Sequence, residues 1–150
     1  MIGAGTKAPD FSLPDHRGKQ VSLSDFAGRK LVLAFYPLDW SPVCTDQLSL
    51  YQEVVGEIES QGATLVGISV DSSYSHRAFR KHLNLTIPLL SDFNPKGEVC
   101  RAYGAWIEQV GHANRSLALI EDGEVTWSYA TPTPADIPGA NLIFDALSEP

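Results

Sequence analysis

A buried strand, a long helix and a second buried strand follow one another early in the chain, and this order constrains the fold more than any other feature. Residues 31–36 read Leu-Val-Leu-Ala-Phe-Tyr, an apolar run typical of a strand covered on both faces. Residues 42–60 carry apolar side chains at helical spacing, and Gly62 follows as a left-handed cap. Residues 64–70 form a second apolar run, rich in β-branched side chains. Two such strands joined by a helix pair in parallel through a right-handed crossover, so the sequence predicts an α/β fold.

The remaining segments predict a central mixed sheet flanked by helices, with a β-hairpin at the N-terminus. Pro88 indicates either an edge strand or a bend, because proline has no N–H for a sheet ladder. Asp122-Gly123 is a strong hairpin turn signal. With 150 residues the chain suits a single domain over residues 1–150. The other expected elements are a hairpin over 11–23, helices over 71–83, 95–103 and 140–147, and strands over 87–90, 115–120 and 124–129.

Composition excludes several classes of function. The chain is 43% hydrophobic and 19% charged, as in an ordinary globular protein. A net charge of −7 gives no support to binding of nucleic acid or of an anionic membrane surface. No apolar run approaches the roughly 20 residues that span a bilayer, and the first residues lack a signal-peptide pattern. We therefore expect a cytoplasmic protein.

The turn between the first buried strand and the long helix holds a candidate nucleophile. Pro37 ends the strand, and Ser41-Pro42 has the N-cap serine and first-position proline of a helix start. Cys44 then occupies the third helical position. Free N–H groups and the positive end of the helix dipole favour an anion there, so this thiol is expected to ionise more easily than a free one.

Cysteine and histidine spacing argues against a structural disulfide or a metal site. The chain has two cysteines, Cys44 and Cys100, and no Cys-x-x-Cys motif. Two thiols in an apparently intracellular chain are better explained as reactive or simply buried. The histidines do not fall at zinc-ligand spacing, so no metal is predicted, and we interpret them as surface or core-edge residues: His16, His76, His82 and His112.

The residues from Pro37 to Cys44 match the motif Pro-x-x-x-Thr/Ser-x-x-Cys, and Arg115 opens a later strand. With these residues in order the chain resembles the peroxiredoxins (AhpC/TSA family), thiol peroxidases on a thioredoxin-like fold. It is most similar to the one-cysteine alkyl hydroperoxide reductase E type, through Leu90-Ser91-Asp92-Phe93, Tyr103-Gly104 and Asn114-Arg115. The likeness covers essentially residues 5–147. It departs from the family at Ser41, where threonine is commoner, and at Trp40, where phenylalanine is commoner.

The resemblance implies a catalytic role for four residues. Cys44 attacks the peroxide as a thiolate and becomes a sulfenic acid. An ordinary thiol is only a few per cent ionised at neutral pH, and a helix terminus contributes only about 0.3–1 kcal/mol, so a nearby positive charge is needed. Arg115 is expected to supply it. Ser41 offers a hydroxyl to the thiolate or the peroxide, in competition with its helix-capping role, and Pro37 shields the sulfenic acid.

Four further residues are expected around the substrate. The Val43 N–H is predicted to help hold the distal oxygen, and Gln47 to orient Arg115. Tyr36 and Trp40 flank the motif, although packing explains them as well, and Trp40 also suits a dimer interface. Each motif residue has an ordinary structural explanation too, as a buried thiol, a salt-bridge partner, a cap or a strand terminator.

The resemblance also implies the partners: a peroxide substrate, an external thiol reductant (thioredoxin, a glutaredoxin-like protein or a low-molecular-weight thiol) and a second copy in a homodimer, with no cofactor. The family's resolving positions hold Ser49 and the segment 78–80, so a one-cysteine cycle is favoured. Cys100 stays open as a possible resolving thiol in a two-cysteine peroxidase. A non-enzymatic redox-sensing or chaperone module is the remaining alternative.

Overall fold

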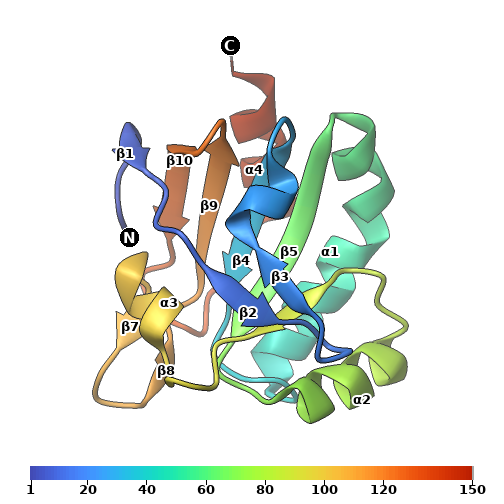
Figure 1. Ribbon diagram of the computed structural model, residues 1–150. Coiled ribbons are helices and arrows are strands. Elements are labelled where there is room, and N and C mark those ends of the chain that lie inside the picture. The colour runs from blue at the N-terminus through green and yellow to red at the C-terminus, as the bar shows by residue number, and fades with distance from the viewer. Residues whose placement is uncertain (150) are drawn as a thin grey trace.

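A mixed β-sheet forms the centre of the computed structural model, which describes residues 1–149 (Figure 1). The strand order is β1-β10-β9-β4-β5-β6. Strands β4, β5 and β6 are parallel, whereas β9 runs antiparallel to β4. The predicted mixed sheet flanked by helices is therefore confirmed. The strand bounds are Thr6–Lys7 (β1), Lys30–Phe35 (β4), Ala63–Ser69 (β5), Leu89–Ser91 (β6), Ser116–Glu121 (β9) and Glu124–Ala130 (β10).

The predicted strand-helix-strand unit is present, and its helix α1 spans Pro42–Ser60. Proline occupies its first position, where the missing N–H costs nothing. Gly62 follows its end with φ of 79°, a left-handed conformation that glycine adopts without steric cost. Local signals at both ends thus fixed the bounds of this helix.

Shorter elements surround the sheet. The N-terminal hairpin is confirmed as a separate two-stranded sheet. Strand β6 begins just after Pro88 and lies at the sheet edge, one of the two alternatives that this proline left open. Helix α3 begins later than predicted because the Asp92 carboxylate accepts from the N–H groups of Val99 and Cys100 and so sets its start. The hairpin of β7 and β8 was not predicted. The bounds are Ser12–Pro14 (β2), Gln20–Ser22 (β3), Leu23–Phe26 (the 3₁₀ helix η1), Ser73–Leu83 (α2), Glu98–Ala102 (α3), Trp106–Ile107 (β7), His112–Ala113 (β8) and Ala140–Ser148 (α4).

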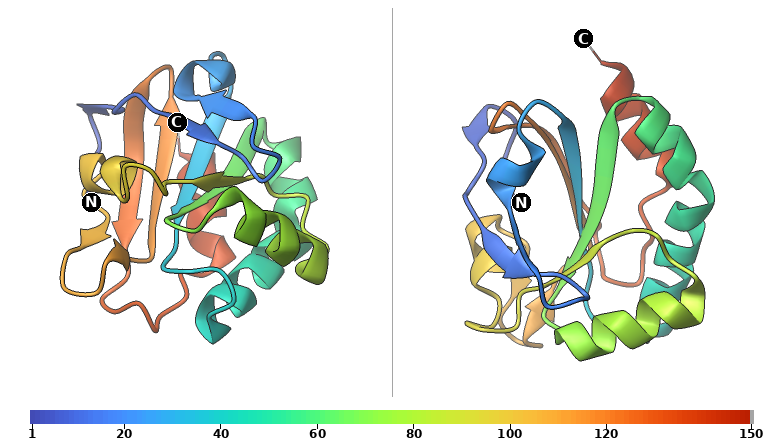
Figure 2. Two further views of the ribbon diagram at one scale, coloured as in Figure 1. Left: turned by 60° about the horizontal axis from the view of Figure 1, so that its bottom comes forward. Right: turned by 45° about the vertical axis from the view of Figure 1, so that its right-hand side comes forward.

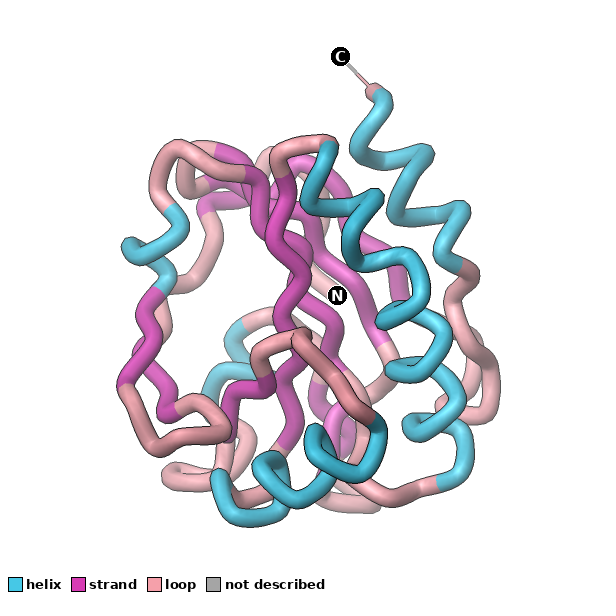
Figure 3. Tube along the Cα trace, turned by 90° about the vertical axis from the view of Figure 1, so that its right-hand side faces the viewer, coloured by secondary structure: helices cyan, strands magenta, loops and turns pink. Residues whose placement is uncertain are grey.

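Two hydrophobic cores lie on the two faces of the sheet. Side chains alternate along a strand, so Val32 and Ala34 of β4 join one core while Leu33 and Phe35 join the other. Helices α1 and α4 cover the first face, and the N-terminal segment and α3 cover the second (Figures 2 and 3). Within residues 1–149, no helix combines the length and apolar character needed to cross a membrane.

Candidate active site

Cys44 is the third residue of α1 and its side chain is fully buried. Helices leave their first N–H groups without intrahelical partners, so the sulfur sits beside unpaired donors at the positive end of the helix dipole. Ser41 takes the N-cap position, but its hydroxyl does not cap the helix. It donates instead to the Leu38 carbonyl oxygen at 3.1 Å. Of the two roles expected for the Ser41 hydroxyl, helix capping is therefore not the one that the structure shows.

The Arg115 guanidinium lies next to this sulfur. Its Nη1 donates to Cys44 Sγ at 3.2 Å and to Gln47 Oε1 at 2.6 Å, and its Nε donates to the Pro134 carbonyl at 2.9 Å. The side chain is only 1% exposed. Within residues 1–149 no carboxylate comes within ion-pair distance of it. A buried cation without a carboxylate partner favours a negative charge on the neighbouring sulfur or on a bound oxygen.

Sheet register explains how residues 71 positions apart meet. Phe35, the last residue of β4, pairs with Ser116, the first residue of β9. The chain leaves β4 toward α1 at this end of the two strands, and Arg115 directly precedes β9 at the same end. Thr131 then fixes the Arg115 backbone, since its N–H and hydroxyl both donate to the Arg115 carbonyl at 3.1 Å.

A cavity of about 270 Å³ opens at this point. Four residues expected at the site line it: Pro37, Ser41, Val43 and Arg115. His112, Pro134 and Ala135 line it as well and were missed. Nothing in the local sequence pattern marks the last two, because they belong to a proline-rich loop; His112 carries only its closeness in sequence to Arg115 as a signal.

Two residues expected around the substrate lie elsewhere. Tyr36 is fully buried, and its hydroxyl donates to Asp39 Oδ1 at 2.6 Å, away from the cavity lining. Trp40 packs on α2 with 49% of its surface exposed. Gln47 is buried and lies against Arg115, the position expected of a residue that orients the guanidinium.

The interpretation of the histidines was wrong for His76, which is fully buried rather than at the surface or core edge. Its Nδ1 lies 2.8 Å from Asp39 Oδ2. Asp39, Asp71 and His76 offer three potential metal-ligand atoms within 4.8 Å of one another. Hydrogen bonds among neighbouring groups already use these atoms, including one from Ser69 to Asp71. The cluster is therefore a hydrogen-bond network in this structure.

Cys100 lies on the opposite side of the sheet from Cys44. Cys44 belongs to the core beneath α1, whereas Cys100 is fully buried in the core beneath α3. Burial, together with the nearby carboxylate of Asp92, raises the pKa of the Cys100 thiol far above its usual value. Both cysteines are free thiols.

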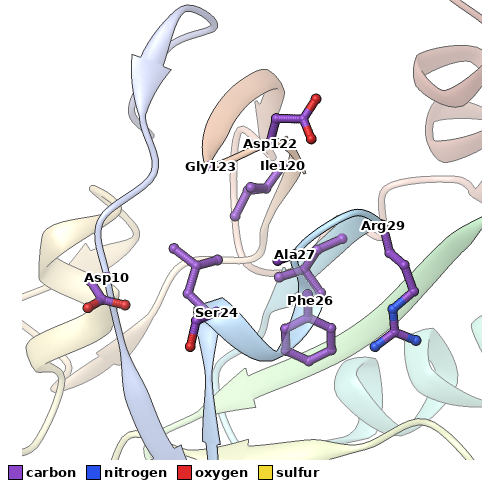
Figure 4. A pocket seen from close by; sticks show the side chains of 10 residues that line it. Asp10, Ser24, Phe26, Ala27, Arg29, Ile120, Asp122 and Gly123 are labelled. Carbon is purple, nitrogen blue, oxygen red and sulfur yellow. The ribbon is translucent and has the colours of Figure 1, made fainter.

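A second cavity, of about 210 Å³, lies at the other end of β4 (Figure 4). Leu23, Phe26 and Ile120 give it apolar walls, and Asp10 and Arg29 belong to its lining. None of its lining residues is a cysteine or a histidine, so this second cavity offers no thiol nucleophile.

Comparison with known proteins identifies the family. The model of the AhpC/TSA family matches residues 4–128. The chain belongs to the AhpC/TSA family. It is 32% identical to alkyl hydroperoxide reductase E of Mycobacterium tuberculosis over 149 residues, which covers 99% of this chain and 97% of that protein. It is 38% identical to the putative peroxiredoxin bcp of Coxiella burnetii over 108 residues, 72% of this chain and 70% of that one.

Solved structures of this family share the fold. Enterococcus faecalis AhpC superposes with a TM-score of 0.88 at 25% identity, covering 98% of this chain and 91% of that one. The peroxidoxin BcpB of Mycobacterium tuberculosis superposes with a TM-score of 0.84 at 26% identity, covering 99% of this chain and 96% of that one. The thioredoxin-like fold predicted from the resemblance is thereby confirmed, and as a peroxiredoxin the chain is a thiol-dependent peroxidase.

Proposed function

We propose that this peroxiredoxin reduces hydrogen peroxide and organic hydroperoxides through a one-cysteine cycle at Cys44. The observation that carries the proposal is the 3.2 Å contact between Arg115 Nη1 and Cys44 Sγ, made by a guanidinium that no carboxylate within residues 1–149 neutralises. A fixed positive charge at this distance stabilises the sulfur anion and the charge that develops on the peroxide oxygens.

The reaction transfers one oxygen atom to sulfur. The Cys44 thiolate attacks the terminal oxygen of the hydroperoxide, an S–O bond forms and the O–O bond breaks. The second oxygen leaves as an alkoxide or hydroxide, which takes a proton and departs as alcohol or water. One external thiol then displaces the sulfenic hydroxyl as water and forms a mixed disulfide, and a second thiol releases Cys44 as its thiol.

The residues around the sulfur have separate roles in this cycle. Arg115 holds the thiolate and the peroxide, and Gln47 fixes the guanidinium by accepting from Nη1 at 2.6 Å. The free N–H of Val43 offers a donor to the peroxide oxygen. Ser41 lines the cavity, and its oxygen accepts from the peroxide while its own proton is used on the Leu38 carbonyl. Pro37 covers the sulfenic acid from one side.

The position of Cys100 supports a cycle that does not use it. A disulfide needs the two Cα atoms within about 7 Å, and the sheet separates these two cysteines. A thiol whose pKa is raised by burial is also a poor attacking group, because the thiolate is the nucleophile. A two-cysteine cycle within one chain would require one of the two cores to open.

The proposal extends to the substrate, the reductant, the setting and the assembly of the protein. The lining of Pro37, Val43, Pro134 and Ala135 is largely apolar and suits the carbon chain of an organic hydroperoxide. We propose an external thiol as the reductant, a cytoplasmic setting and a homodimer. Leu38 and Trp40 support the dimer, since these apolar residues are 40% and 49% exposed in the loop between β4 and α1.

The test is the intact mass of the protein after one equivalent of hydrogen peroxide, with remaining thiols blocked. The one-cysteine cycle predicts the gain of one oxygen atom, both in the wild type and in Cys100→Ser. Loss of two hydrogen atoms in the wild type alone would establish a Cys44–Cys100 disulfide instead. Steady turnover with excess peroxide and an external thiol is expected, and negligible turnover would favour a sensing or chaperone module.

A further inference from the structure

A buried histidine–carboxyl contact ties helix α2 to the loop that precedes the helix of the reactive cysteine. His76 Nδ1 is 2.8 Å from Asp39 Oδ2, and both side chains are fully buried. His76 Nε2 lies 3.0 Å from the Leu90 carbonyl oxygen, which can only accept, so Nε2 carries a proton. The 2.8 Å contact between Nδ1 and Asp39 Oδ2 holds a second proton, so both ring nitrogens of His76 are hydrogen-bonded.

Further donors saturate the Asp39 carboxylate. Tyr36 donates to Oδ1 at 2.6 Å, and Ser75 donates to Oδ2 at 2.8 Å. The backbone N–H of Asp39 in turn donates to Asp71 Oδ2 at 2.8 Å. Buried polar groups are tolerated when they are hydrogen-bonded in this way, and removing one partner leaves the other buried without compensation.

Asp39 lies in the middle of the loop from Tyr36 to Ser41, between β4 and α1. Next to it, Trp40 has a φ of 73°, a left-handed conformation that costs a non-glycine residue energy and persists only when the surroundings impose it. The Trp40 ring packs 5.1 Å from the Phe79 ring, and its indole N–H donates to Ser75 Oγ at 3.3 Å. Helix α2 therefore holds this loop at two successive residues.

His76 links this loop to the sheet as well, because its second nitrogen is bound to Leu90 in β6. The loop ends at Ser41, and Cys44 follows within the first turn of α1. A shift of the loop therefore moves the Cys44 sulfur as well, because only a few backbone torsions separate them. A shift of about 1 Å in a reacting group can reduce a rate by about 100-fold.

We propose, on the basis of the function proposed above, that His76 is a positioning residue for the peroxidatic thiol. Through its bond to Asp39 it holds the Tyr36–Ser41 loop in its strained conformation and so fixes Cys44 against Arg115. The residue has no contact with the reacting atoms. Its effect on the rate passes through Asp39.

The experiment is a double-mutant cycle on the rate constant of Cys44 oxidation by hydrogen peroxide, measured per folded molecule. We expect His76→Leu and Asp39→Asn each to slow oxidation by about 10- to 100-fold. The double variant is expected to be no slower than the slower single variant, because both break the same link. Tyr103→Phe is the matched control: it loses a partly buried hydrogen bond to Pro9 on the opposite face of the sheet and should oxidise as fast as the wild type.

Two readouts separate positioning from a general loss of stability. His76→Asn keeps an N–H donor near the place of Nδ1 and is expected to recover most of the rate lost in His76→Leu. Proton NMR of the wild type should show a downfield imidazole N–H signal that disappears in Asp39→Asn. Equal slowing in His76→Asn and His76→Leu, or independent effects that multiply in the double variant, would overturn the proposal.

A wild-type rate in folded His76→Leu would overturn the proposal too, whereas a wild type that does not oxidise at all would refute the proposed function instead. Ser75→Ala covers the case in which the buried substitutions prevent folding. It removes one donor to Asp39 and one acceptor from Trp40. A slowing of about threefold or more supports the positioning role, and an unchanged rate contradicts it.

Discussion

Replacing Arg115 by methionine tests the electrostatic basis of the site most directly. Methionine preserves much of the side-chain volume and removes the charge. The lost contact to the sulfur spans 3.2 Å. A hydrogen bond to a charged group contributes about 1.5–3 kcal/mol, which corresponds to a slowing of roughly 10- to 150-fold. The Coulomb energy of two unit charges at this distance is about 5 kcal/mol at an effective dielectric constant near 20, an upper bound of a few thousand-fold.

We therefore expect Arg115→Met to oxidise about 100-fold more slowly than the wild type. Arg115→Lys keeps the charge but cannot satisfy Cys44 and both acceptors at once, so its slowing should be smaller, about 10-fold. The assay is stopped-flow oxidation by hydrogen peroxide over a range of concentrations, with folding verified by circular dichroism. The exposed Arg101→Met on α3 serves as a control for the loss of any arginine.

The result that refutes this reasoning is a folded Arg115→Met variant whose rate stays within about threefold of the wild type. The guanidinium would then be a structural contact that happens to face the sulfur. A second consequence is separate from the rate. The variant leaves Gln47 Oε1 and the Pro134 carbonyl without a donor, so it should also unfold at a lower urea concentration.

Three further predictions concern stability and assembly. Burial raises the pKa of Tyr51 to about 12, so stability present below about pH 10 should fall between about pH 10 and 12, and Tyr51→Phe should weaken this dependence of the urea midpoint on pH. Gly67→Ala would bring a Cβ to 2.8 Å from a Leu89 methyl group and should cost about 1–3 kcal/mol in urea unfolding, whereas Gly56→Ala, with nothing within 4 Å in α1, should be neutral or stabilising. Trp40→Ser should weaken the proposed homodimer, and an unchanged sedimentation coefficient at dilution would contradict its place in the interface.

The bounds of α1 and the parallel pairing of its two strands could be predicted because their signals are local. A run of apolar residues, a proline at the first helical position and a glycine after the last turn all act within a few residues. The position of Cys44 in the first turn follows from the same signals. The hairpin of β7 and β8 gave no comparable signal, since each strand has only two residues.

The burial of His76 could not be predicted in the same way. Polar residues in an amphipathic helix normally face solvent, and its partner Asp39 stands 37 positions away in a different segment. The two residues meet because α2 packs against the loop that follows β4. The same holds for Ser41. Its sequence position allowed the hydroxyl either to cap the helix or to serve the site, and only the loop geometry shows that it donates to the Leu38 carbonyl.

The sequence by itself determined which backbone segments became the strands and helix of the α/β unit and that a thiol stands at a helix N-terminus, because hydrophobic periodicity and helix capping depend on near neighbours. Only the tertiary structure decided that Arg115 reaches that sulfur, that Cys100 lies across the sheet from it, and that His76 and Asp39 pair beneath it. These are contacts between distant segments, and they depend on strand register and on which face of the sheet each side chain occupies.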